Sequence, residues 1–143
     1  MDLYEEIVQL YLTVLENCFV LPQFHVSVDA NGKPWDASID FLALNLGNKR
    51  IEVVEVSKAA SPNKAAHFAE MLQGSHRTNV EKFIGSKLNR DLNYSITWRF
   101  FVRRANVERL IGQPAFREYV QAGGEAQVTA IEDVFDALRD QMP

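Results

Sequence analysis

The sequence predicts an α+β (α/β) domain with a mixed central sheet of about four to five strands flanked by helices. The first observation is a pair of apolar runs, residues 37–44 and 50–57, of which the second is rich in Ile and Val, as strands are. The second is another strand pattern at 94–102, dense in aromatic residues. The third is the three- to four-residue apolar period of 3–19 and 62–88, which predicts helices before and between the strands.

Composition limits the class of protein. The chain has 143 residues, the size of one domain, so we expect residues 1–143 to form a single domain. Hydrophobic residues make up 47%, enough for a sizeable core, while the formal net charge of −4 argues against a globally basic nucleic-acid binder. Cys18 is alone, which excludes a disulfide framework. The acidic first residues do not resemble a signal peptide, and no apolar run approaches the ~20 residues of a membrane span. We therefore expect a cytoplasmic protein without membrane association.

At the amino-terminal end, the period predicts a helix from about residue 3 to Phe19 that Pro22 ends. The expected buried stripe of this helix consists of Leu3, Ile7, Leu10, Val14 and Cys18, widened by Tyr11 and Leu15. Alternation over residues 24–29 then predicts a half-buried strand, and the residues at 31–34 are typical of a turn.

The two central strands form an expected hairpin. Residues 46–49 supply its turn, where Gly47 and Asn48 tolerate positive φ. Each strand carries one acidic residue inside an apolar run, Asp40 and Glu55. A carboxylate in a buried strand is costly unless a charged or hydrogen-bonding group meets it, and two on neighbouring strands repel each other unless they share a cation. This pair is therefore the place where the sequence indicates chemistry.

A basic, helical segment follows. Ser61-Pro62 opens a helix that runs to about Gln73, is interrupted at Gly74-Ser75 and continues through Leu88. Its basic side chains either form a solvated face or contact phosphates. Arg103-Arg104, at the end of the later strand, either faces solvent or meets a phosphate or a carboxylate.

The rest of the chain looks mostly helical. The expected elements are short helices at 106–111 and 114–121, a brief strand near 127–128 and a final helix from Thr129. Thr129 and Glu132 form a capping box for that helix. Its apolar side consists of Ile131, Val134, Phe135 and Leu138.

The hairpin resembles the motif of the PD-(D/E)xK nuclease superfamily, which has the restriction-endonuclease-like fold. The matching residues are Ile39-Asp40-Phe41 and the run from Val53 to Ser57, with Glu55 as the second acid. The family's lysine position falls on Ser57, and Lys58 is one residue late. Since a strand alternates faces, Lys58 is expected to point away from the side that Glu55 and Ser57 share. The resemblance covers roughly residues 3–104; residues 105–143 would be a family-specific cap or a dimerisation element.

The resemblance implies a metal-dependent hydrolase of nucleic-acid phosphodiesters. Asp40, Glu55 and the backbone carbonyl of Val56 would bind Mg²⁺ or Mn²⁺, which prefer oxygen ligands. In some members of the family a glutamate of the first helix completes the site, and here Glu6 or Glu16 is available. The candidate catalytic residues are Asp40, Glu55, Ser57, Lys58 and Lys64, with Lys64 the better placed lysine if its helix starts beside the motif strand.

Two other interpretations remain open. In one, the same fold is a catalytically inactive module that binds a protein or a nucleic acid, as Ser57 and the acidic balance favour. In the other, the motif is accidental and the domain unrelated, with Asp40 pairing locally with Lys49 or Arg50. A shared metal site favours the enzyme, whereas a contiguous apolar surface patch favours the protein-binding module. The sequence also leaves DNA or RNA and the oligomeric state open, a homodimer included.

Overall fold

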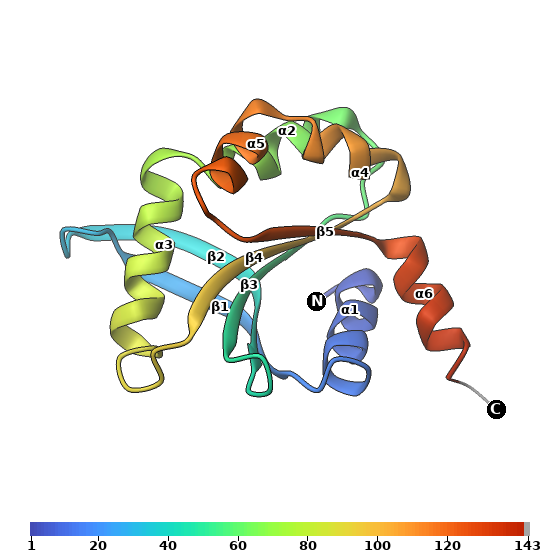
Figure 1. The fold of residues 1–143 in the computed structure, drawn as a ribbon, viewed down its shortest axis with the longest axis horizontal. Helices are drawn as coiled ribbons and strands as arrows, with labels where there is room; N and C mark the ends of the chain where they lie inside the picture. Colours follow the sequence, from blue (N-terminus) through green and yellow to red (C-terminus); the bar gives the residue numbers. More distant parts are fainter. Residues whose placement is uncertain (142–143) are drawn as a thin grey trace.

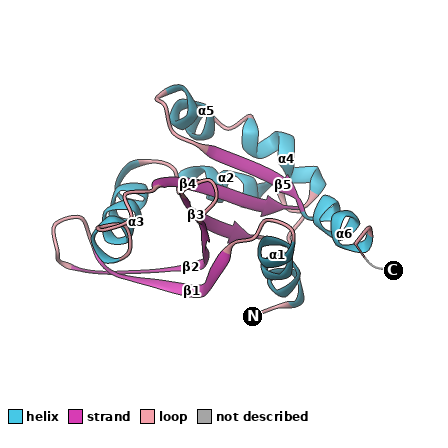
Figure 2. Cartoon of the chain, turned by 60° about the horizontal axis from the view of Figure 1, so that its bottom comes forward, coloured by secondary structure: helices cyan, strands magenta, loops and turns pink. Residues whose placement is uncertain are grey.

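The computed structural model describes residues 1–141 and has an α+β fold, a five-stranded mixed sheet with helices on both faces (Figures 1 and 2). Residues 142 and 143, the end of the expected carboxyl-terminal extension, lie outside the described residues. The strands are β1 (Phe19–Val28), β2 (Pro34–Asn45), β3 (Arg50–Val56), β4 (Ser95–Val102) and β5 (Ala126–Ala130). The helices are α1 (Leu3–Val14), α2 (Pro62–Glu70), α3 (Gly74–Lys87), α4 (Arg104–Ile111), α5 (Pro114–Gln121) and α6 (Ile131–Arg139).

The strands lie in the sheet in chain order, β1 to β5. The first three pair antiparallel, and the predicted hairpin turn joins β2 to β3. The chain then crosses through α2 and α3, so that β4 pairs parallel to β3 from Arg50 opposite Ser95 to Val56 opposite Phe101. A second crossover through α4 and α5 adds β5 parallel to β4. No helix within residues 1–141 is long and apolar enough to cross a bilayer.

Strand β3 lies at the centre of the molecule and is buried on both faces. Ile51 and Val53 belong to the core formed with α2 to α5, whereas Val54 belongs to the core formed with α1 and α6. Because side chains alternate along a strand, Glu52 points to the α1 side and Glu55 to the α2 side. Both carboxyl side chains are only 5% exposed. The two faces therefore each receive one buried acid.

The amino-terminal helix is shorter than predicted and turns a different side to the sheet. It ends at Val14, because Asn17 takes a left-handed φ of 53° that reverses the chain. Pro22 does not end it but lies in β1, an edge strand that tolerates the missing N–H. The residues that pack inward are Val8 and Leu12. The predicted stripe is correct for Ile7 and Tyr11, which pack against the core, and for Cys18, which is buried. It is wrong for Leu3, Leu10 and Val14, which are 64%, 51% and 54% exposed.

The middle and the carboxyl-terminal part follow the prediction more closely. The helical segment is interrupted where expected, since α3 begins at Gly74 with φ 57°. The brief strand is longer than predicted, and its pairing to β4 completes the sheet. The capping box is wrong, because Thr129 stays in β5 opposite Phe101 and the last helix begins at Ile131. The carboxylate of Glu132 instead accepts a hydrogen bond from the Arg104 backbone N–H at 2.9 Å.

The exposure of the last helix predicts an order of destabilisation that side-chain size alone would not give. Ile131 is 1% exposed and Phe135 is 40% exposed. We expect Ile131→Ala to lower the free energy of unfolding by about 2–5 kcal/mol and Phe135→Ala by only about 1–2 kcal/mol. Urea denaturation of both variants measures the difference. A greater loss for Phe135→Ala would contradict the packing described here.

Candidate functional site

The two acidic residues of the hairpin converge where β2 changes face. Ile39 packs in the core on the α2 side and Phe41 in the core on the α1 side, so the strand twists at Asp40. On the neighbouring strand, Gln23 has a left-handed φ of 52° at the same level. Asp40 then reaches across to the end of β3, where its Oδ2 accepts a hydrogen bond from the Val56 N–H at 2.8 Å. This bond fixes one carboxylate at the carboxyl end of the central strand.

Glu55 lies beside Asp40 in a nearly dry environment. Its side chain is 5% exposed, and Oε1 is buried without a hydrogen-bond partner. Burial raises the pKa of Glu55 well above its usual value, and the neighbouring Asp40 carboxylate raises it further. Lys64, on α2, lowers the same pKa by its positive charge. Asp40 and Glu55 are therefore neighbours, and Lys64 acts on Glu55 by its charge without forming an ion pair with it, its Nζ lying 5.7 Å from the centre of the Phe68 ring. The three residues are called the acid pair and its lysine below.

The remaining candidates lie just after β3. Ser57 is buried, and its hydroxyl oxygen accepts a hydrogen bond from the Ala59 N–H at 3.2 Å. Its own N–H donates to the Phe101 carbonyl at 2.9 Å, which extends the pairing with β4. Lys58 is exposed. Ser57 is thus used in a turn and supplies no positive charge to the acid pair.

A buried amide holds the loop that leads from β3 to the lysine's helix. Asn106, on α4, is fully buried, and its Nδ2 donates to the carbonyl oxygens of Ala59 and Ser61 at 3.1 and 3.0 Å. Ser61 in turn caps α2 by accepting from the Asn63 N–H. The position of Lys64 therefore depends on a side chain from a distant helix.

The first helix does not complete this site. Glu6 is exposed, and Glu16 binds Arg99 of β4 through both of its carboxylate oxygens. Glu52 lies 3.5 Å from the same guanidinium. The Cys18 thiol is 3.9 Å from Glu52, and burial raises its pKa to about 12, so the thiol stays protonated. Because the Arg99 guanidinium already supplies the positive charge between these carboxylates, we interpret the cluster as a structural ion pair.

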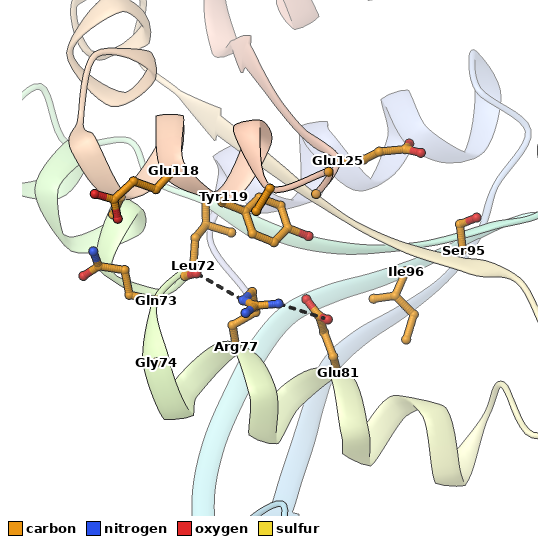
Figure 3. A pocket seen from close by; sticks show the side chains of 14 residues that line it. Leu72, Gln73, Gly74, Arg77, Glu81, Ser95, Ile96, Glu118, Tyr119 and Glu125 are labelled. Atoms are coloured by element: carbon orange, nitrogen blue, oxygen red, sulfur yellow. Dashed lines mark hydrogen bonds and ion pairs between the residues drawn. The ribbon is translucent and has the colours of Figure 1, made fainter.

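A separate cavity of about 670 Å³ lies between α3, α5 and the start of β4 (Figure 3). Arg77 projects into it from α3, 5.3 Å from the centre of the Tyr119 ring, and its Nε donates to the Leu72 carbonyl at 3.2 Å. Glu81 lies 3.6 Å from Arg77 Nη1 and accepts the indole N–H of Trp98 at 2.9 Å. The acid pair and its lysine do not line this cavity.

Comparisons with known proteins were made at three levels. No family model, no curated protein and no solved structure matches the chain. The sites must therefore be interpreted from their own geometry.

Sequence reasoning identified the acid pair but missed Arg99 and Arg77. A signal existed for Arg99, since it is a charged residue inside the apolar run of β4, as Glu55 is in β3. Its partners come from distant segments, so their identity had no local signal. Arg77 and Tyr119 are likewise brought together only by the packing of α3 near α5.

The Arg99 cluster predicts a large cost of removing the guanidinium. Arg99→Met would leave Glu16 and Glu52 without their cation, so we expect a loss of about 3–5 kcal/mol in the free energy of unfolding. Arg139→Met, which removes an exposed pair with Asp136, should cost at most about 1 kcal/mol. Chemical denaturation of the two variants provides the comparison, and equal losses would rule out the structural role.

Glu55 predicts a particular dependence of stability on pH. In the folded chain its raised pKa lets it keep a proton that the unfolded chain has already released. The resulting stabilisation is complete below the unfolded pKa of about 4.3 and is lost as the pH rises through the folded pKa. Glu55→Gln cannot ionise, so we expect it to melt at a higher temperature than the parent at pH 8, with the difference vanishing near pH 4.

Thermal melts in EDTA measure this difference. Glu70→Gln, an exposed change on α2, should leave the profile unaltered. A Glu55→Gln variant that melts at or below the parent at pH 8 would show that the buried carboxylate is compensated in the metal-free protein.

Proposed function

We propose that Asp40 and Glu55 bind one Mg²⁺ or Mn²⁺ ion and that the chain hydrolyses phosphodiester bonds of nucleic acid at this site. The observation that carries the proposal is the contrast between two glutamates of one strand. Glu52 and Glu55 are equally buried, but Glu52 has the Arg99 guanidinium at 3.5 Å, whereas Glu55 Oε1 has no partner and faces a second carboxylate. A divalent cation would supply the charge that this side of the strand lacks.

The residues present fit such an ion. Both are carboxylates, whose oxygens are the ligands that Mg²⁺ and Mn²⁺ favour, and the Val56 carbonyl is the third proposed ligand. When bound, the ion would lower the pKa of a water molecule and stabilise the charge that develops on a scissile phosphate. The Val56 N–H holds the Asp40 carboxylate in place.

Lys64 takes the role of the lysine that the motif lacks at Ser57. It comes from the first turn of α2, and its charge acts on Glu55. An ammonium group there would stabilise a phosphate oxygen or orient the attacking water. Ser57 contributes a hydroxyl that is already engaged by the Ala59 N–H. Lys58, exposed on the loop, is proposed to contact substrate phosphate rather than the reacting atoms.

A catalytically inactive module on the same fold is the alternative proposal. Two observations favour it: the lysine of the motif is replaced by Ser57, and Glu55 is 5% exposed, which leaves little room for a substrate to approach it. In that case the acid pair would bind a metal ion that only stabilises the fold, or would bind no ion. The chain would act by binding a nucleic acid or a protein. Under either proposal we place the chain in the cytoplasm, where a free, buried Cys18 is usual.

The metal site predicts stabilisation by Mn²⁺. At a concentration about tenfold above the Kd, binding should add about 1.4 kcal/mol, which raises the Tm by roughly 4 °C for a chain of this size. Asp40→Asn and Glu55→Gln should abolish the shift. Asp36→Asn, an exposed change on the same strand as Asp40, should retain it. Absence of any shift with millimolar Mn²⁺ or Mg²⁺ would remove the basis for the metal site.

The catalytic proposal predicts metal-dependent cleavage of plasmid, single-stranded DNA or RNA. Loss of Lys64 should reduce the rate by about 10²–10³, as expected for one charged group acting on the transition state. Lys82→Ala, on α3, should leave the rate unchanged. If Lys64 acts as the motif lysine, Ser57→Lys should leave the rate unchanged. If no residue of the parent takes that role, Ser57→Lys should raise the rate.

Asp40→Asn, prepared identically, is the control for contaminating nuclease. If the parent binds Mn²⁺ but neither it nor Ser57→Lys cleaves any substrate, the inactive module is the correct alternative. Cleavage that persists in Asp40→Asn would come from a contaminating nuclease and would not support the catalytic proposal.

A further inference from the structure

Helix α1 carries two apolar rows, of which the sheet covers only one. Val8 and Leu12 are buried against the core on the α1 side. Leu3, Leu10 and Val14 recur at helical spacing on another side, and each is more than half exposed. A helix that is apolar on two sides is typical of one that is covered on two sides. Within residues 1–141, the outer row is thus left uncovered.

Helix α6 lies beside α1 and carries a further exposed apolar side chain. The two helices lie side by side in both views (Figures 1 and 2) and contact each other. Tyr4 of α1 meets the ring of Phe135 edge to face, with the ring centres 6.1 Å apart, and Phe135 is 40% exposed. The outer face, defined by Leu3, Leu10, Val14 and Phe135, is thus a surface of exposed apolar side chains across two helices.

The two segments that carry this face are acidic. Residues 1–16 hold Asp2, Glu5, Glu6 and Glu16 with no lysine or arginine, and residues 131–141 have a net charge of −3. Arg99, Arg103 and Arg104 pair with carboxylates of these segments. With those three arginines included, the lobe formed by the two segments still has a net charge of −4, equal to that of the whole chain.

An exposed apolar face on acidic segments fits one kind of partner. Anionic lipid surfaces and nucleic acids would be repelled, and a second copy pairing through the same face would bring two acidic lobes together. We propose that the outer face binds a basic amphipathic helix of a partner protein, with apolar side chains against Leu10, Val14 and Phe135 and lysines or arginines beside the carboxylates. The proposal does not depend on the metal site, which lies on the other side of the sheet.

A designed peptide tests this recognition. The probe is a helical peptide of about 18 residues with leucines at i, i+3, i+4 and i+7 and lysines elsewhere, titrated by calorimetry at two salt concentrations. We expect binding that weakens with salt and falls about tenfold or more in the double variant Leu10→Gln/Val14→Gln. The matched control is Leu46→Gln, an apolar residue 47% exposed in the β2–β3 turn, which should bind as the parent does.

Other outcomes would overturn the proposal. Equal binding by Leu10→Gln/Val14→Gln and the parent would place the peptide elsewhere, and equal binding of a peptide with glutamates in place of the lysines would exclude charge selection. A parent dimer in light scattering that the double variant makes monomeric would identify a second copy as the occupant. All the substituted side chains are exposed, so unchanged melting temperatures verify that the variants remain folded.

Discussion

Burial of β3 on both faces is the constraint on which both charged clusters depend. A strand between two cores has no side open to water, so each of its acidic side chains must find compensation inside the protein. Glu52 finds it in Arg99, which β4 delivers from the parallel neighbour and which also binds Glu16 beyond the end of α1. Glu55 meets Asp40 instead, with Lys64 as the nearest opposite charge that acts on it. Within the described residues, the same strand thus carries an ion pair on one face and, on the other, two neighbouring carboxyl groups that form no ion pair.

The parts of the fold that were predictable are those set by local patterns. Strands β2 and β3 follow from their apolar runs and turn residues. The parallel pairing of β4 with β3 is the arrangement that a crossover through the intervening helical segment favours. The orientation of α1 did not follow, because both of its rows are apolar and the 3.6-residue period cannot choose between them. The capping box at Thr129 failed because Thr129 lies in β5, where its pairing with Phe101 of β4 outweighs a local capping preference.

The candidate site was likewise predictable only where a local pattern of the sequence indicates it. Asp40 and Glu55 stand out because a charge inside an apolar strand requires an explanation, and this signal needs no knowledge of the fold. The approach of Lys64 depends on where α2 begins, which Asn106 fixes from α4, 45 residues beyond Ser61 in the chain. The role of Glu16 was predicted only as an alternative. The residue that decides against it, Arg99, lies on a strand that was predicted from its aromatic residues, and its charge was given no role. The residue types of the site could be read from the sequence, but which distant residues meet there could not.

The proposed metal site and the proposed docking face lie on opposite sides of the sheet. Val54 points into the core that α1 covers, and its neighbour Glu55 points the opposite way toward α2. A partner on the outer row of α1 would leave Val8, Leu12 and Val54 packed as they are, because those side chains are already fully buried. Sites that share no side chain contribute nearly additively to the free energy unless a two-state element joins them. The ion pair between Arg99 and Glu16 joins the chain just after α1 to β4 and so opposes a shift of α1 relative to the sheet. The two proposed sites should therefore operate independently, one on each side of the sheet.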